Sequence, residues 1–179
     1  MIHDLDSQKS VVAFTDGSCY PNPNGAGGWA FTCFYNGHSA MKYGCCADGA
    51  TNNSMELTAI LRCLQYVPFG ENHRYPFTVY TDSKYAKNAL TKWVVNWMEN
   101  DQWLTSIGQL VKNVDILKEA YSLVQSHSRY RDFSLKWIKG HSGIPENELV
   151  DKNASSARHN QITNWKDKDN KNVTITLPN

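Results

Sequence analysis

The chain has 179 residues, of which 41% are hydrophobic and 20% are charged, and its formal net charge is +1. This length suits a single domain, the composition excludes an intrinsically disordered chain, and no stretch reaches the roughly 20 apolar residues of a membrane span. The near-neutral charge excludes a uniformly basic nucleic-acid binder, so any contact with nucleic acid must come from local patches or from bound metal ions.

The five cysteines contain no Cys-x-x-Cys pair, and the polar N-terminus lacks the apolar core of a signal peptide. We therefore expect a cytoplasmic protein whose thiols are reduced, with no disulfide framework and no structural zinc. We also expect a monomer that makes no contact with a membrane.

The first part of the chain predicts three strands. Residues 11–15 form an apolar strand, and a loop rich in Gly, Pro and Asn follows at 17–28. The next two strands, 29–35 and 40–46, are joined by the hairpin signal Asn36-Gly37.

A helix and a fourth strand come next. After a loop at 48–53, Ser54 is positioned to cap a helix whose apolar residues recur at helical spacing until Pro68 ends it. Residues 77–81 then form a fourth strand, which ends at Asp82.

The second half of the chain is mostly helical. Residues 83–126 predict several helical pieces with apolar stripes. A fifth strand is expected at 132–138, followed by a flexible loop at 140–143 and a helix that starts at Pro145 and reaches about residue 159.

The order of these elements defines the fold class. Strands joined by hairpins form a meander, whereas strands reached through long helical connections pair in parallel. We predict an α/β fold with a mixed five-stranded sheet, three antiparallel strands then two parallel, flanked by helices. The predicted division is a polar N-terminal segment at 1–10, one domain at 11–159, and a loose C-terminal tail at 160–179 that ends in a short strand at 173–177.

Two strands end in the same dipeptide, which indicates a shared site. Ala13-Phe14-Thr15-Asp16 and Val79-Tyr80-Thr81-Asp82 are both apolar strands that end in Thr-Asp. Ligands bind outside the carboxyl ends of parallel strands, so pairing of these two would bring both aspartates to one edge. Their charges would raise each other's pKa unless a divalent cation such as Mg²⁺, which takes oxygen ligands, is bound there.

Each acid taken alone has a plainer explanation. An Asp after a strand is a common turn or cap residue. Glu56 and Asp151 lie near the starts of helices, where acids interact favourably with the helix dipole. On the residues alone, both interpretations stay open.

Four separated motifs resemble those of the type 1 ribonuclease H family. They occur in the family's order and extend over most of the chain, from Val11 to about His159. One such motif can arise by coincidence, and four in the right order make coincidence rare. The motifs are Asp16-Gly17-Ser18-Cys19, Thr51-Asn52-Asn53-Ser54-Met55-Glu56-Leu57, Thr81-Asp82-Ser83-Lys84-Tyr85, and Trp137-Ile138-Lys139-Gly140-His141-Ser142-Gly143 with Pro145-Glu146-Asn147-Glu148 and Asp151.

The resemblance implies a metal-dependent endonuclease that hydrolyses the RNA strand of RNA–DNA hybrids and leaves 5′-phosphate and 3′-hydroxyl ends. The residues that match the family's four metal-binding carboxylates are Asp16, Glu56, Asp82 and Asp151. The implied cofactor is Mg²⁺, with two ions in the active complex and Mn²⁺ as an alternative. His141 matches a loop histidine that assists proton movement and product release near neutral pH.

The resemblance also implies contacts with the substrate. Asn22, Asn52 and Asn53 match positions that face the minor groove, where amides can both donate and accept hydrogen bonds. Thr51 and Asn52, with Asn22 nearby, match a pocket that grips a phosphate of the DNA strand. Such phosphate contacts set the register, whereas contacts to the 2′-hydroxyl identify the RNA strand. The asparagines also suit turns, and both roles can hold together.

Two features depart from the bacterial members that the chain resembles. The protruding handle at 91–115 carries Met98-Glu99-Asn100-Asp101-Gln102 in place of a basic cluster. Its Trp93 and Trp97 are candidates for substrate contact, although aromatic residues at helical spacing are more often core. Lys84 replaces a glutamine and cannot accept a hydrogen bond, so we expect it to contact a phosphate.

Two other functions stay open. Transposases and integrases resemble the same fold, so a different nuclease or a strand-transfer enzyme is the alternative within catalysis, although the His141 loop and the Glu56 helix favour hydrolysis of hybrids. A non-catalytic hybrid-binding protein is the second alternative, although all four carboxylates are present. The starting Met and the separate tail favour a free-standing enzyme over a module of a polymerase chain.

The weakly charged handle predicts a shallow salt dependence of hybrid binding. Fewer lysines and arginines neutralise fewer phosphates, so log affinity should fall only slowly as log salt concentration rises. Fluorescence anisotropy of a labelled hybrid at increasing salt tests this expectation. A steep loss of affinity between low and moderate salt would contradict it.

Overall fold

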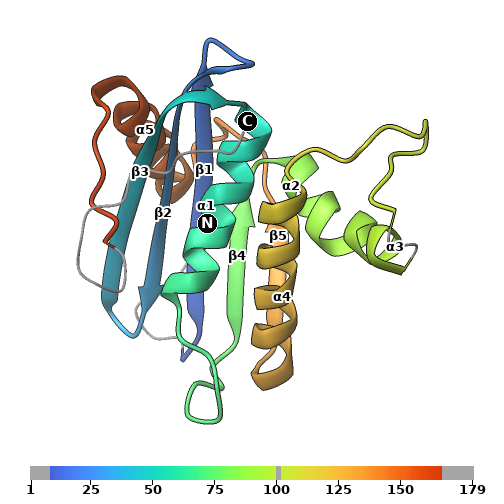
Figure 1. Ribbon diagram of the computed structural model, residues 1–179. Coiled ribbons are helices and arrows are strands. Elements are labelled where there is room, and N and C mark those ends of the chain that lie inside the picture. The colour runs from blue at the N-terminus through green and yellow to red at the C-terminus, as the bar shows by residue number, and fades with distance from the viewer. Residues whose placement is uncertain (1–8, 100–101, 167–179) are drawn as a thin grey trace.

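The protein, a computed structural model that describes residues 9–99 and 102–166, consists of one sheet with helices on both faces (Figure 1). α1 (Asn52–Tyr66) and α4 (Val114–Tyr130) cover one face, and α5 (Pro145–Asn160) covers the other. None of the described helices is both long and apolar enough to cross a membrane.

The sheet has the strand order β3-β2-β1-β4-β5. β1 (Val11–Tyr20), β2 (Gly25–Tyr35) and β3 (His38–Ala50) form an antiparallel meander. β4 (Phe77–Thr81) pairs in parallel with β1, and β5 (Phe133–Trp137) pairs in parallel with β4. This is the mixed α/β sheet that the sequence predicts.

Two apolar clusters fill the space between the sheet and its helices. The larger cluster lies under α1 and α4 and includes Trp29, Phe31 and Leu57, whereas the smaller lies under α5 and includes Phe14 and Val150. All five cysteines are buried, and none of them forms a disulfide. The predicted hairpin is also present, with the positive φ angles that Asn-Gly accepts readily.

β1 and β2 are longer than predicted, because the glycines at 17–28 allow close packing and do not form one long turn. A Cβ on Gly17 would lie 2.2 Å from the Glu56 backbone nitrogen, and a Cβ on Gly28 would lie 2.1 Å from the Ala154 carbonyl oxygen. The absence of side chains therefore lets α1 and α5 approach the sheet from opposite faces. The expected loop contracts to the few residues between the two strands.

α1 begins earlier than predicted, because Thr51 and not Ser54 is its N-cap. The Thr51 hydroxyl accepts a hydrogen bond from the Ser54 backbone N–H at 3.0 Å, and the Ser54 hydroxyl accepts one from the Thr51 N–H at 2.9 Å. This reciprocal pair is a capping box that satisfies two donors at the helix start. Since β3 runs to Ala50, the loop expected at 48–53 reduces to a single residue.

Three short helical elements lead from the sheet into the handle, and its return at 102–113 contains no helix. These elements are α2 (Lys84–Asn88), η1, a π-helix (Ala89–Trp93), and α3 (Val94–Glu99). They extend away from the sheet beside α4 (Figure 1). The prediction that 83–126 is mostly helical, in several pieces, agrees with the described residues except at 102–113, where no helix forms and an isolated bridge between Leu104 and Leu110 turns the chain back.

We predicted a loose C-terminal tail, and this is wrong for its described part, which packs against β3. The Asn164 side chain accepts from the Tyr43 backbone N–H at 2.7 Å, and the Tyr43 carbonyl accepts from the Asn164 N–H at 3.0 Å. Trp165 meets Trp29 edge-on, with ring centroids 5.8 Å apart. The segment is mostly polar, so its composition does not indicate that Trp165 packs against the core.

Two predicted segments fall mostly outside the described residues. Only the last two residues of the N-terminal segment 1–10 are described, and the short strand expected at 173–177 lies beyond the described range. The domain boundaries at 11–159 and 160–179 stay predictions.

Trp165→Ala should lower the free energy of unfolding by about 2 kcal/mol, because it removes a half-buried aromatic contact with the core. The matched control is Ile162→Ala, three residues away, where the side chain is 41% exposed and the change should stay within about 0.5 kcal/mol. Urea denaturation measures both values. Equal stabilities of wild type and Trp165→Ala would mean that this segment does not pack on β3 in solution.

Candidate active site

The register of the sheet brings two acids together at one edge. Thr15 and Thr81 are paired in the parallel ladder between β1 and β4. Asp16 and Asp82 follow them directly, so both carboxylates leave neighbouring strands at the same level. Asp16 is only 5% exposed, because α1 and α5 cover the sheet on both sides of it. The repeated Thr-Asp dipeptide predicts this juxtaposition.

The third acid comes from α1. Because Gly17 lets the backbone of α1 approach β1, Glu56 in the first turn of that helix lies beside Asp16. One carboxylate oxygen from each of Asp16, Glu56 and Asp82 lies within 4.8 Å of the other two. Three acids that are distant in the sequence therefore share one small volume.

Asp151, on α5, is near this group and oriented differently. The charge of Asp151 contributes to the raised pKa of Asp16. The group of acids within 4.8 Å in the described chain consists of Asp16, Glu56 and Asp82 and does not include Asp151. Its Oδ2 atom lies 3.6 Å from Nδ1 of His141. The structure thus brings three of the four predicted carboxylates into one compact group, with the fourth paired to the predicted histidine.

Burial and like charge make the compact group costly to ionise. Burial, followed by the charges of Asp82 and Asp151, raises the pKa of Asp16 to about 8. Burial, followed by the charges of Asp16 and Asp82, also raises the pKa of Glu56 well above its ordinary value. Oε2 of Glu56 is buried and has no hydrogen-bond partner. An oxygen-only donor set with an unsatisfied buried oxygen fits a hard divalent cation such as Mg²⁺ or Mn²⁺.

Three residues that the sequence interpretation did not assign hold Asp82 in place. Asn147, only 2% exposed, donates from Nδ2 to Oδ2 of Asp82 at 3.3 Å. The Trp137 indole donates to the Asp82 carbonyl oxygen at 2.9 Å. A Cβ on Gly140 would lie 2.6 Å from Oδ2 of Asp82, so a larger residue there would displace the Asp82 carboxylate. Asn147 belongs to a motif quoted for the resemblance, but nothing in the sequence alone shows which way it points.

His141 lies on an exposed loop between β5 and α5. Its side chain is 82% exposed, and its φ of 49° is left-handed. Two hydrogen bonds stabilise this loop: the Ser142 hydroxyl donates to the Lys139 carbonyl at 2.6 Å, and the Gly143 N–H donates to Glu148 Oε1 at 3.1 Å. The flexibility expected at 140–143 stays a prediction.

The residues predicted to contact substrate gather where β3 meets α1. Asn22 accepts a hydrogen bond through Oδ1 from the Asn52 backbone N–H at 3.1 Å, which ties the β1–β2 loop to the helix start. Asn52 and Asn53 are exposed in the first turn, and Thr51 is engaged in its capping box. The turn and cap roles are therefore present, while exposed amide groups remain at the surface.

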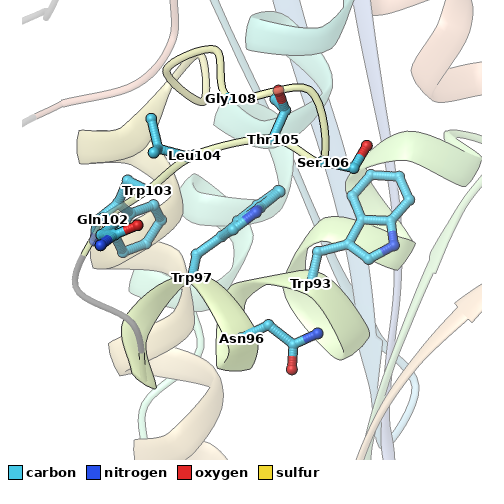
Figure 2. Close-up of a pocket in the computed structure, with 9 residues that line it drawn as sticks. All are labelled: Trp93, Asn96, Trp97, Gln102, Trp103, Leu104, Thr105, Ser106 and Gly108. Atoms are coloured by element: carbon cyan, nitrogen blue, oxygen red, sulfur yellow. The ribbon is translucent and has the colours of Figure 1, made fainter.

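Lys84 and the handle continue this surface. The Lys84 ammonium lies 4.6 Å from the centroid of the Trp137 ring, within range of a cation–π contact. Trp93 and Trp97 line a cavity of about 810 Å³ (Figure 2). Trp93 is 38% exposed, whereas Trp97 packs 6.0 Å from Trp103. Neither tryptophan is fully buried, so both keep surface that a ligand can reach.

Comparisons with known proteins agree with this fold. The family model for RNase H matches residues 8–159. The ribonuclease H of Orientia tsutsugamushi is 40% identical over 148 residues, which is 83% of this chain and 82% of that protein. The ribonuclease H of Francisella tularensis subsp. novicida is 41% identical over 150 residues, which is 84% and 91% of the two chains.

A solved structure shows the same fold at lower identity. LC9-RNase H1, described as a type 1 RNase H with the type 2 active-site motif, superposes with a TM-score of 0.71 at 23% identity. The match covers 88% of this chain and 75% of that one. The fold is thus the one that solved ribonuclease H structures share. The chain belongs to the ribonuclease H family.

The raised pKa of Asp16 predicts an inverse pH dependence of stability when divalent ions are absent. A carboxyl with a raised folded pKa stabilises the fold below its unfolded value of about 4, and that stability is lost as pH rises through about 8. In EDTA, Asp16→Asn should therefore gain stability relative to wild type between pH 5 and pH 8. Mg²⁺ should stabilise wild type at pH 8, because it binds the ionised acids.

Urea denaturation of both proteins, with EDTA and with Mg²⁺, checks this expectation. A difference between wild type and Asp16→Asn that is independent of pH would contradict the raised pKa. An absence of any effect of Mg²⁺ on wild type would contradict the fit of the site to a divalent cation.

Proposed function

We propose that the protein is an endonuclease that hydrolyses the RNA strand of RNA–DNA hybrids and leaves 5′-phosphate and 3′-hydroxyl ends. The observation that carries this proposal is the group of three carboxylates at the sheet edge of a ribonuclease H fold. Membership of the family supports the reaction class. A foamy viral protease–reverse transcriptase, solved in complex with an RNA/DNA hybrid, has the same fold at 16% identity and a TM-score of 0.68, covering 89% of this chain and 21% of that one.

The carboxylates are the proposed ligands of the cofactor. Asp16, Glu56 and Asp82 would hold one divalent ion, and Asp151 would complete the site for a second. Two such ions supply an activated water and charge stabilisation at the leaving oxygen of an in-line displacement. We propose Mg²⁺ as the natural ion because all the donors are oxygens, with Mn²⁺ as a substitute.

Two neighbouring residues would support this chemistry. Asn147 would fix the orientation of the Asp82 carboxylate through its hydrogen bond to Oδ2. His141, exposed and 3.6 Å from Asp151, is placed to carry a proton between the site and solvent. Its location on a surface loop also suits a role in product release.

The surface beside α1 would recognise the hybrid. We propose that Asn22, Asn52 and Asn53 read the minor groove and that Thr51 and Asn52 hold a DNA-strand phosphate. Exposure of both α1 amides supports this assignment. Further along the chain, Lys84 would contact a phosphate, and Trp93 and Trp97 would pack against sugar or base surface of the hybrid at the cavity in the handle. A cytoplasmic location and a monomeric state complete the proposal.

The decisive assay follows a labelled RNA strand in a hybrid, with and without Mg²⁺. Wild type should cleave it only with the ion, and Asp16→Asn should reduce the rate at least about a thousandfold while hybrid binding stays largely intact. Asp132→Asn is the matched control, since Asp132 is an exposed acid just before β5 and should leave the rate unchanged.

Duplex DNA, duplex RNA and single strands in the same assay separate the alternatives. Cleavage of duplex DNA in preference to the hybrid would favour a strand-transfer enzyme or another nuclease. Binding of hybrid without cleavage would favour a non-catalytic protein. Full activity of Asp16→Asn would remove Asp16 from the mechanism.

A further inference from the structure

A row of side chains leads from the acidic group along the contact between β1 and α5. On β1, alternate residues share a face, and on α5, residues spaced by four and then three share a face. The members of the row are Asp16, Ser18 and Tyr20 from β1, and Asp151, Ser155 and Arg158 from α5. The acids lie at one end of the row, and a tyrosine and an arginine lie at the other.

Contacts between the two elements fix this alignment. The Arg158 Nε atom donates to the Ser18 hydroxyl at 3.0 Å, and the Ser155 hydroxyl donates to the same oxygen at 3.4 Å. The Arg158 guanidinium carbon lies 5.7 Å from the centroid of the Tyr20 ring. At the other end of the row, the charge of Asp151 acts on Asp16. α5 therefore runs alongside β1 over the whole row.

Arg158 has no carboxylate within 4.0 Å among residues 9–99 and 102–166, where the one ion pair joins His141 to Asp151. A guanidinium has five donors, and the Ser18 contact uses one of them. Tyr20 beside it is 72% exposed. An exposed aromatic ring next to an arginine suits a ligand that has both a negative charge and a flat or apolar part.

We propose that Arg158 and Tyr20 form a subsite for the RNA strand, in which Arg158 binds a backbone phosphate and Tyr20 packs against the adjoining ribose. This assignment rests on the proposed function. Seven helical residues separate Asp151 from Arg158, about 10 Å, and four strand residues separate Asp16 from Tyr20, about 13 Å. At about 3.4 Å of axial rise per nucleotide, the subsite lies about three nucleotides from the bond that is cut.

The location of the row favours the RNA strand over the DNA strand. Asp16 and Asp151 would hold the phosphate that is cut, and Arg158 and Tyr20 continue the same row along β1 and α5. The proposed contacts to the DNA strand, Thr51 and Asn52, lie at the start of α1, on the opposite face of the sheet. A phosphate at Arg158 therefore belongs to the strand that occupies the acids.

The test uses hybrids with one cleavable site, shortened step by step on either side of it. Arg158→Ala should reduce kcat/KM about tenfold, through KM, on substrates that extend more than about three nucleotides on one particular side. On substrates truncated inside that length, wild type and variant should be equal. Arg158→Lys should keep part of the activity on long substrates, because a lysine retains the charge without the planar fork.

A neutral phosphate supplies a second measurement. A methylphosphonate at the position about three nucleotides from the cut should weaken wild type and leave Arg158→Ala unaffected. Lys42→Ala is the matched control, since it removes one positive charge near Tyr66 at the far end of α1 and should change neither result.

The outcomes separate this proposal from the function on which it rests. A loss in Arg158→Ala that is the same for every substrate length, or no loss at all, would overturn the subsite while wild-type cleavage still stands. The subsite would also be overturned if the methylphosphonate weakened Arg158→Ala as much as it weakens wild type. If wild type cleaves none of the hybrids, the proposed function itself has failed.

Discussion

The structure depends on the convergence of three acids that repel one another. Oxygens of Asp16, Glu56 and Asp82 lie within 4.8 Å of one another at a largely buried edge of the sheet. Two of these acids have raised pKa values because burial and neighbouring charge oppose ionisation. The folded chain relieves this repulsion by retaining protons or by binding a divalent cation. Near neutral pH, cation binding allows all three groups to be ionised together.

The rest of the fold supplies the rigidity that this arrangement requires. The β1–β4 register sets the separation of the two aspartates, and Gly17 lets the helix that carries Glu56 approach from one face. Asp82 is contacted by Trp137 of β5 and Asn147 of α5, and Gly140 in the loop between these elements leaves room for its carboxylate. Each acid is thus held by elements that pair across long stretches of sequence, so the site forms only when the whole sheet forms.

Much of this arrangement could be predicted from the sequence, because periodicity and strand-end residues are local signals. The fourth strand, the last helix, the Asn36-Gly37 hairpin and the pairing of the two Thr-Asp segments follow from such signals. Glycine is ambiguous: the same residues that indicate a turn at 17–28 serve close packing inside β1 and β2. The choice between these roles depends on which helix lies opposite, and sequence alone does not show that.

Other features depend on contacts between distant residues and left no local signal. The direction of Asn147, the pairing of Asp151 with His141, and the packing of Trp165 on β3 are of this kind. The sequence of the polar tail does not show whether Trp165 packs against the core or is exposed. The row that ends at Arg158 likewise appears only when β1 and α5 are placed side by side.

The central claim is that Asp16, Glu56 and Asp82 share a divalent cation. Anomalous diffraction from a crystal of the protein soaked in Mn²⁺ tests it most directly, because the signal locates the ion without reference to activity. The account predicts a peak within about 2.2 Å of a carboxylate oxygen of each of these residues, the distance expected for an octahedral oxygen site. A peak elsewhere on the protein, with none between these acids, would contradict it.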